Sequence, residues 1–391
     1  MSASKSSCCS AKSVESCCPT SNPLAHFDNM IENCLKYAKK AKKQGKPIVG
    51  IFCEYTPREI IMAANAVPVC MCGGSNQTIS AAEQDLPANL CPLIKSSYGY
   101  AKLKCNPFLE MSDLLVGETT CDGKKKMFEI LGQTRPMYIL ELPQKVDDKQ
   151  AFEHWKQELV KFKKYLEKKF RTTITNKRLK DAIKVMNQER QLRRRIAELA
   201  KSNPPLLTGL DILNAKSLIA GIPEDFKVYE EIISSARRNG SKGDVRPRIL
   251  VTGVPMPHEA EKVMRIIEDV GGAVVAQENC TGLRPIEADV REDIDPIQAL
   301  AEKYFYLPCS VMTPNTRRLQ ALDRLIKQYQ PQAVIELIWQ GCLTYDVESY
   351  FIRKHIKGKH RLPYLKIETN YSPSDSGQLK SRIQALLEMI D

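Results

Sequence analysis

Cysteine is the residue type in this chain with the most evident capacity for chemistry. The sequence holds 14 cysteines among 391 residues. Its polar N-terminus has no apolar stretch of the kind that directs secretion. In an exported protein so many cysteines would indicate disulfides, whereas a reducing cytoplasm favours metal binding or redox chemistry. We therefore expect a cytoplasmic protein whose thiols bind metal.

Six of these cysteines occupy positions where the ligand-binding groups of α/β proteins usually gather. Four follow the carboxyl ends of predicted strands, and two adjoin prolines in connecting segments. A thiolate beside a helix N-terminus has a lowered pKa, and the free N–H groups there can bond to the sulfurs of an anionic cluster. The six candidates are Cys53, Cys91, Cys121, Cys280, Cys309 and Cys342.

Four further cysteines are weaker candidates for metal binding. Cys34, Cys70 and Cys72 lie within predicted helix or strand runs, where a free cysteine usually acts as a small buried apolar residue. Cys105, which precedes Asn106-Pro107, is a reserve candidate for metal binding.

The absence of several motifs narrows the chemistry. No C-x-x-C pair is present, which disfavours zinc ribbons, thioredoxin-like motifs and ferredoxin-type clusters. Residues 117–125 resemble a phosphate-binding loop, but the loop has one residue too many and ends in Lys125 rather than Ser or Thr. Neither G-x-G-x-x-G after a strand nor G-x-S-x-G occurs. We therefore expect no ATP or NAD site in the chain itself and no hydrolase chemistry.

Alternating strands and helices must position the cysteines. Short apolar runs predict buried strands, and helical patterns fill the gaps between them. After the first strand, Thr56, Pro57 and Glu59 predict a helix start with a capping box. Such alternation indicates parallel sheets covered on both faces, so we predict an α/β fold with two Rossmann-like domains and additional helical segments. Strands are predicted at 47–53, 67–72, 113–117, 136–142, 248–252, 273–276, 333–339 and 363–367.

Composition shifts along the chain predict four parts. Residues 1–25 form a Cys/Ser-rich tail whose pairs Cys8-Cys9 and Cys17-Cys18 have no apolar residues nearby to fix a metal site, so a flexible extension is expected. The other three parts are a first Rossmann-like domain with a leading helix at 26–148, a basic helical segment at 149–244 and a second Rossmann-like domain at 245–391.

The formal charge of +12 is concentrated between Lys156 and Arg195. Such a series can indicate nucleic-acid binding. Apolar residues recur beneath the charges at helical spacing, however, so we favour a solvated helix face and expect no nucleic acid. A docking face for an acidic partner is a third possibility. No stretch approaches the roughly 18 apolar residues that a membrane helix needs, so no membrane contact is expected.

Six segments together resemble one known family. The resemblance covers nearly everything after the tail, in the same order along the chain. The sequence is similar to the subunits of 2-hydroxyacyl-CoA dehydratases and benzoyl-CoA reductases, and within this family to the double-cubane cluster proteins. The matching segments are CEYTPRE at 53–59, CPLIKSS at 91–97, GETTCDGKKK at 117–126, CTGLR at 280–284, PC at 308–309 and GCLTY at 341–345.

The resemblance implies an iron–sulfur cofactor. In the double-cubane group, one chain supplies six thiolates, three to each of two [4Fe–4S] units bridged by sulfide, which gives an [8Fe–9S] cluster. The six cysteines named above would be the ligands. Dehydratase subunits of the same fold hold a single [4Fe–4S] cluster with three cysteines, and this remains the alternative.

The resemblance also implies an ATP-dependent reductase system. A separate iron–sulfur ATPase, an activator of the archerase type, would pass low-potential electrons to a homodimer of this chain. The cluster would then reduce a small molecule such as acetylene, azide or hydrazine. The alternatives are a 2-hydroxyacyl-CoA dehydratase subunit, which needs a second and different chain, and a non-catalytic electron carrier.

Residues beside the cysteines are candidates for tuning the cluster. Burial and hydrogen bonds to sulfur adjust the potential of such a group. Arg284 would stabilise the anionic cluster or merely pair with Glu287. Glu118 or Lys124 would deliver protons, although charged residues more often lie at the surface or serve structure. The candidates around the cluster are Thr119, Thr120, Asn279 and Arg284.

Overall fold

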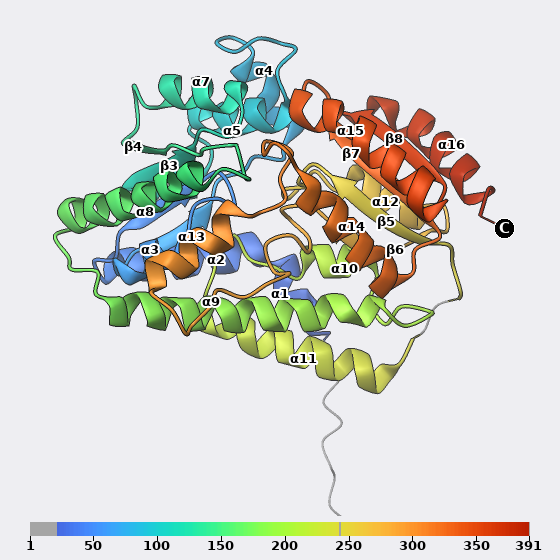
Figure 1. Cartoon of the computed structure of the whole chain (residues 1–391), viewed down its shortest axis with the longest axis horizontal. Coiled ribbons are helices and arrows are strands. Elements are labelled where there is room, and N and C mark those ends of the chain that lie inside the picture. Colours follow the sequence, from blue (N-terminus) through green and yellow to red (C-terminus); the bar gives the residue numbers. More distant parts are fainter. Residues whose placement is uncertain (1–21, 242–243, 391) are drawn as a thin grey trace, which may run out of the picture.

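Two four-stranded parallel sheets form the framework of the computed structural model, which describes residues 22–241 and 244–390 (Figure 1). The predicted α/β fold with two parallel sheets is confirmed. Residues 1–21 of the predicted tail, which hold both cysteine pairs, lie outside the described residues, and helix α1, Ala25–Asp28, begins at the last residue of the predicted tail. The first sheet has the order β2-β1-β3-β4 and the second the order β6-β5-β7-β8. The strands are β1 Ile48–Ile51, β2 Val67–Cys70, β3 Leu114–Glu118, β4 Met137–Leu140, β5 Arg248–Gly253, β6 Ala273–Glu278, β7 Ala333–Trp339 and β8 Tyr364–Thr369.

Burial explains why these segments become strands. Every residue of β1, β3, β5 and β7 is buried, whereas the edge strands β4 and β8 are partly exposed. In each sheet the strand order reverses beside the first strand, between β1 and β3 and between β5 and β7. Ligands of open α/β sheets bind at such reversals, outside the carboxyl ends of the strands. Each half therefore has one reversal at which a ligand is expected to bind.

Helices cover the sheets and join the two halves. Around the first sheet lie α1 Ala25–Asp28, α2 Met30–Lys43, α3 Arg58–Ala63, α4 Ile79–Ala82, α5 Pro92–Leu103, α6 Pro107–Met111 and α7 Asp122–Leu131. The middle of the chain forms α8 Lys149–Phe170, α9 Asn176–Ala197, α10 Gly209–Asn214 and α11 Pro223–Asn239. The second half adds α12 Lys262–Asp269, α13 Pro296–Phe305, α14 Thr316–Tyr329, α15 Leu343–His355 and α16 Ser376–Leu387.

The predicted capping box at the start of α3 is wrong. Pro57 precedes the helix and provides no side-chain cap. The Thr56 hydroxyl instead donates to the Glu118 carboxylate at the end of β3. The Glu59 carboxylate accepts hydrogen bonds from Arg190 at 2.5 Å and from Tyr304 at 2.7 Å. Both polar side chains are fully buried, and their partners come from distant elements that local sequence rules do not register.

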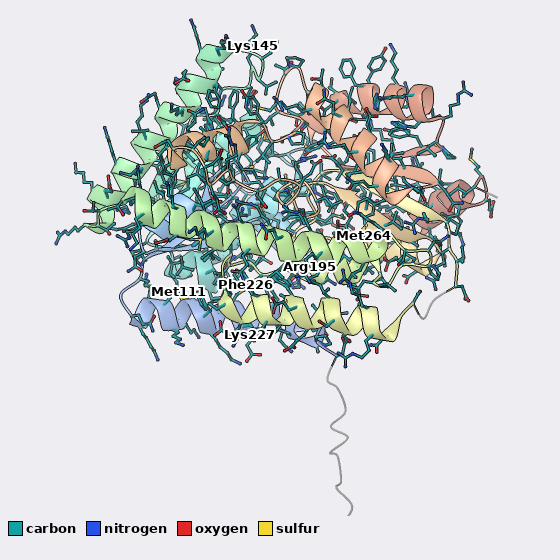
Figure 2. The ribbon with its side chains drawn as sticks, turned by 60° about the horizontal axis from the view of Figure 1, so that its bottom comes forward. Met111, Lys145, Arg195, Phe226, Lys227 and Met264 are labelled. Carbon is teal, nitrogen blue, oxygen red and sulfur yellow. The ribbon has the colours of Figure 1, made fainter. Side chains whose placement is uncertain are left out.

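The basic helical segment has the solvated face that the sequence indicates. In α8 the apolar residues Trp155, Leu159, Phe162 and Leu166 are buried, and the lysines lie outside them. Helices α9 and α11 lie side by side in Figure 2, which labels the exposed Arg195 on α9. Within the described chain, no helix has the length and apolar content needed to cross a membrane.

One segment of the second half packs in the core of the first half. Val290, Ile297, Leu300 and Phe305 belong to the same apolar cluster as residues of β1 and α8. Helix α13 contacts α8 and α9 and lies beside α8 in Figure 1. We call residues 290–312 the crossing segment. It ends near the first sheet, where Thr313 pairs with Lys145, and it carries Cys309.

Candidate metal centre

Cys53, Cys280 and Cys309 form a first group of thiols. Cys53 follows β1, Cys280 follows β6, and Cys309 lies on the crossing segment. Burial raises the pKa of Cys53 well above its usual value, and the nearby thiols of Cys280 and Cys309 raise it further. Burial also raises the pKa of Cys280 to about 12, with a further contribution from Cys309. Three thiols from distant parts of the chain are therefore near neighbours.

Cys91, Cys121 and Cys342 form a second group. Each is the residue before a helix, namely α5, α7 and α15. The Cys342 thiol lowers the pKa of Cys91, and Cys91 in turn raises the pKa of Cys342 well above its usual value. Burial raises the pKa of Cys121, which also feels the charge of Cys342 and of Cys309 in the first group. The two groups therefore adjoin.

Helix starts and a close backbone approach build the second group. The backbone N–H groups of Leu93 and Ile94, in the first turn of α5, lower the pKa of Cys91, after the larger effect of Cys342. This is the stabilisation that a helix N-terminus offers to an anionic sulfur. Gly341 has a φ of +75°, and a Cβ there would lie 2.4 Å from the Asn89 carbonyl oxygen. Glycine at this position lets the Cys342 loop meet the Cys91 loop.

Arg284 and Tyr345 connect the first group to buried charges. The Arg284 guanidinium donates to the Cys280 sulfur at 3.5 Å and to the Tyr345 hydroxyl at 2.5 Å. That hydroxyl lies 3.9 Å from the Cys309 sulfur. Arg284 forms its ion pair with Glu278 at 2.6 Å, so the predicted pairing with Glu287 is wrong. Glu287 pairs with Arg324 instead.

Two buried polar atoms next to the cysteines have no partner. They are the Thr120 hydroxyl and the Asn279 amide nitrogen, in the residues just before Cys121 and Cys280. Buried polar groups without partners are rare, and they mark places where a bound group supplies the missing hydrogen bond. Thr119 differs, because its hydroxyl accepts the Leu142 N–H at 2.8 Å. The free donors and the six thiols fit an anionic, sulfur-rich cofactor.

Glu118 and Lys124 are both buried, which excludes a place at the surface and leaves proton delivery or a structural role. One carboxylate oxygen of Glu118 accepts from Thr56, and the other has no partner. Burial raises the pKa of Glu118 to about 7. Lys124 donates to the Phe52 carbonyl at 2.8 Å. Burial alone would lower the pKa of Lys124, but Cys53 and other acidic groups nearby raise it above its usual value.

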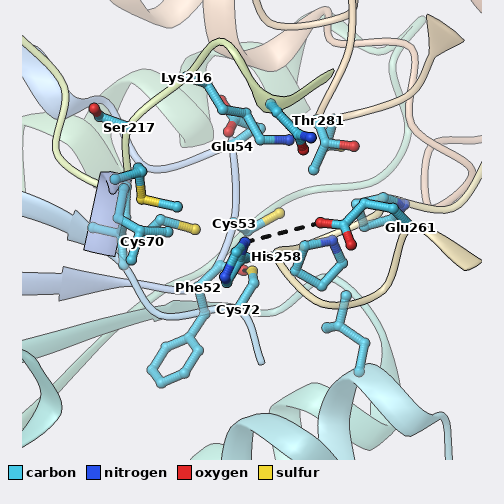
Figure 3. Close-up of a pocket in the computed structure, with 18 of the residues that line it drawn as sticks. Phe52, Cys53, Glu54, Cys70, Cys72, Lys216, Ser217, His258, Glu261 and Thr281 are labelled. Carbon is cyan, nitrogen blue, oxygen red and sulfur yellow. Dashed lines mark hydrogen bonds and ion pairs between the residues drawn. The ribbon is translucent and has the colours of Figure 1, made fainter. Parts of the chain in front are cut away.

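A cavity of about 310 Å³ adjoins the first group of thiols (Figure 3). Cys53 and Cys280 line it together with Cys70 and Cys72, so the expectation that the last two serve only as apolar filling is wrong. The Cys72 thiol donates to the Phe52 carbonyl at 3.1 Å. Its interaction with Cys70 lowers the pKa of Cys70 to about 6. The C-x-C spacing at the end of β2 is the sequence feature that could have indicated that both thiols reach the cavity, because alternate strand residues face the same side.

Comparison with known sequences identifies the family. A profile of the family described as "2-hydroxyglutaryl-CoA dehydratase, D-component" matches residues 53–390. The chain belongs to this family. The protein YjiM of Escherichia coli K12, named provisionally as a dehydratase subunit, is 44% identical over 355 residues, which are 89% of this chain and 93% of YjiM.

Two more distant relatives belong to named enzymes. The beta subunit of (R)-2-hydroxyglutaryl-CoA dehydratase from Acidaminococcus fermentans is 24% identical, over 90% of this chain and 94% of the relative. A benzoyl-CoA reductase subunit from Thauera aromatica is 20% identical, over 73% of this chain and 76% of the relative. The resemblance to dehydratase and reductase subunits is confirmed, and the chain belongs to a family of enzyme components.

The spacing of the thiols bears on the kind of metal site. A tetrahedral zinc ion with Zn–S bonds of about 2.3 Å holds its sulfurs about 3.8 Å apart. Among the described residues, the one set of three ligand atoms that all lie within 4.8 Å of each other belongs to Asp323, His355 and His360. There the Asp323 carboxylate is already engaged by both imidazoles and by Lys359. No three cysteine sulfurs of the described residues all lie within 4.8 Å of one another.

Two other cysteines lie apart from the groups. Cys105, the reserve candidate, is exposed beyond the C-terminal end of α5, whereas Cys91 precedes its N-terminal end. A helix of this length spans about 18 Å, so Cys105 does not join the second group. Cys34 is fully buried in α2 and has the packing role expected of it.

Proposed function

We propose that this chain is an iron–sulfur reductase component that holds a double-cubane [8Fe–9S] cluster. Cys53, Cys280 and Cys309 would bind one cubane unit, and the second group would bind the other. The observation that carries the proposal is the convergence of six thiols in two adjoining groups of three. A single [4Fe–4S] cluster needs three protein thiolates and leaves the first group without a function.

The cofactor would supply electrons of very low potential. It would receive them, in the reducing cytoplasm, from a separate ATP-hydrolysing activator. It would pass them to a small molecule of the acetylene, azide or hydrazine type. The chain itself would work as a homodimer. Its residues would hold the cluster and adjust its potential. Arg284 places a positive charge beside Cys280, and the free donors of Thr120 and Asn279 would bond to sulfur. Such interactions favour the reduced, more negative state.

Proton delivery needs a group that reaches the cluster region without bulk water. Glu118 meets this requirement because it is fully buried, keeps one oxygen free and bonds to Thr56 through the other. The Lys124 ammonium group interacts electrostatically with both Cys53 and Glu118, and it donates a hydrogen bond to the Phe52 carbonyl. We propose that Glu118 carries the proton and that Lys124 positions the Cys53 loop.

A second candidate function is a 2-hydroxyacyl-CoA dehydratase subunit with one [4Fe–4S] cluster on Cys91, Cys121 and Cys342. The names of several relatives favour it, since they are beta subunits of such dehydratases. A non-catalytic electron carrier with the double cubane is a third candidate. It would contain the same iron but show no turnover with activator and ATP.

Iron and acid-labile sulfide per chain in anaerobically purified protein test the proposal. About eight irons support the double cubane, and about four support the dehydratase. Cys280→Ser sharpens the test, because it removes a thiol that only the double cubane uses. We expect this variant to lose about half of the iron or more, whereas Cys121→Ser loses iron under either hypothesis. Cys34→Ser is the control and keeps all of it. Full iron in Cys280→Ser would exclude the double cubane.

A further inference from the structure

Lys216 places an unpaired ammonium group at the cavity beside Cys53 and Cys280. It lies between α10 and α11, in a strand-like stretch where Ile219 pairs with Val69 of β2 and the Leu218 carbonyl accepts the Cys70 N–H. The side chain lines the cavity together with Cys70 and Cys72 (Figure 3). Its Nζ atom is buried and has no hydrogen-bond partner.

The other cations that line this cavity already have partners. Arg58 donates to both carboxylate oxygens of Glu54, each at 2.7 Å. Arg265 lies 3.8 Å from Glu261, and His258 lies 4.0 Å from the same carboxylate. The two remaining cations are Arg193, which is 4.0 Å from Glu189, and Lys124, which donates to the Phe52 carbonyl. Among the described cations that line the cavity, Lys216 is thus the one with neither a hydrogen-bond partner nor an ion pair.

A buried ammonium without a partner is costly, so its retention points to a ligand that supplies the missing charge. Burial lowers the pKa of Lys216 to about 7, and Arg193 lowers it further. An anion bound at Nζ would reverse this shift. The carboxylates of Glu54 and Glu261 lie nearby, but they face their own cations.

The rest of the wall indicates the shape of the ligand. It is mainly apolar, and a volume of about 310 Å³ is at the small end of ligand pockets. A mainly apolar wall with one unpaired cation suits an organic anion better than an inorganic one. A whole coenzyme A ester would not fit. The apolar residues include Phe27, Met30, Phe52, Leu93, Leu218 and Pro255.

We propose that the cavity binds a small organic acid, whose carboxylate pairs with Lys216 while its apolar part faces the thiols of Cys53 and Cys280. The inference rests on the proposed function in one respect: the bound acid is a substrate only if these two cysteines hold the cluster. In that case, short-chain carboxylates would be added to the acetylene, azide and hydrazine type of substrate proposed above. The binding itself does not depend on the cluster.

The test compares butyrate with butyramide, which has the same shape and no charge. Both are titrated calorimetrically into the anaerobically purified full-length protein. We expect butyrate to bind at least tenfold more tightly than butyramide. Lys216→Met should abolish this preference by weakening butyrate binding tenfold or more, with butyramide unchanged. Lys216→Arg, which keeps the charge, should retain the preference.

Lys303→Met is the matched control. Lys303 is half-buried, with a pKa that desolvation lowers to about 8, but it does not line this cavity. The Lys303→Met protein should bind butyrate and butyramide with the same affinities as the unmodified protein. Equal affinity for acid and amide, no saturable binding of either, a preference that survives Lys216→Met, or inorganic phosphate binding as tightly as butyrate would each overturn the proposal.

Iron analysis of the same samples tests the acid site and the double-cubane function separately. Lys216→Met should keep the iron content of the unmodified protein, so a loss of butyrate binding reflects the lost charge. If the iron content excludes the double cubane while butyrate still requires Lys216, the acid site stands and the proposed function fails. If about eight irons are present and acid and amide bind equally, the proposed function stands and the acid site fails.

Discussion

Cys121 and Cys309 are neighbours in the structure, although one opens α7 in the first half and the other follows α13 in the second. The nearby Cys309 thiol raises the pKa of Cys121, after the larger effect of burial. This relationship joins the two groups of thiols into one centre. It depends on the crossing segment, which carries Cys309 into the core of the first half.

Asn187 on α9 fixes the start of the crossing segment. Its amide donates to the Val290 carbonyl at 2.8 Å and accepts the Val290 N–H at 2.9 Å, and Asn187 is buried. Asn187→Ala leaves both backbone groups without partners, so we expect a loss of about 2 kcal/mol in the free energy of unfolding. Denaturant unfolding measures this loss, and iron retention should fall with it. Asn239→Ala, at an exposed position on α11, is the control and should change neither.

Arg284 should raise the reduction potential of a cluster held by Cys280. At an effective dielectric constant of 20, two unit charges roughly 6 Å apart interact by about 3 kcal/mol. Loss of this positive charge in Arg284→Met should therefore lower the potential by about 100 mV, in a redox titration followed by electron paramagnetic resonance. Arg324→Met removes an exposed arginine that pairs with Glu287, and it should leave the potential unchanged. Equal shifts in the two variants would contradict a local effect of Arg284.

The residues that could be predicted from sequence are those fixed by local pattern. Cys121 and Cys342 follow strands and precede helices, and both features are visible in a short window. The neighbours of Cys309 could not be predicted, because the crossing segment joins the first core through long-range packing.

Buried charges escaped prediction for a related reason. Glu278 and Glu287 are both close to Arg284 in sequence, and only the buried end of β6 makes Glu278 the partner. Lys216 also went unnoticed, since a lysine between two helices is normally solvated. The sequence therefore predicts where ligands emerge from strands. It does not predict which charges the fold buries around them.

Thr119 and Thr120 are adjacent, yet their substitution by valine should affect the stability of the cluster-free protein differently. The Thr119 hydroxyl accepts the Leu142 N–H, so Thr119→Val should destabilise the protein by about 1 kcal/mol with or without a cluster. The Thr120 hydroxyl is buried without a partner, so Thr120→Val should leave the cluster-free protein equally or more stable. With the cluster bound, the same variant should lower the reduction potential. An unchanged potential would show that Thr120 does not bond to the cluster.

The affinity of the cavity for butyrate should depend on pH through Lys216. The side chain must be protonated to pair with a carboxylate, and burial lowers its pKa to about 7. Binding should therefore approach a plateau about one unit below this pKa and weaken toward tenfold per unit well above it. The groups that face Lys216 are Arg193, Glu261, Cys70 and Glu54.

The pKa of Cys70 is close to the measured range. The interaction with Cys72 lowers the pKa of Cys70 to about 6, so its thiol is already mostly ionised at the pKa of Lys216. Cys70→Ser should consequently keep the decline in butyrate affinity above pH 7. Lys216→Arg should remove this decline, because a guanidinium stays charged throughout. Calorimetric titration from pH 6.5 to pH 9 distinguishes these cases, and a flat profile in the unmodified protein would contradict the role of Lys216.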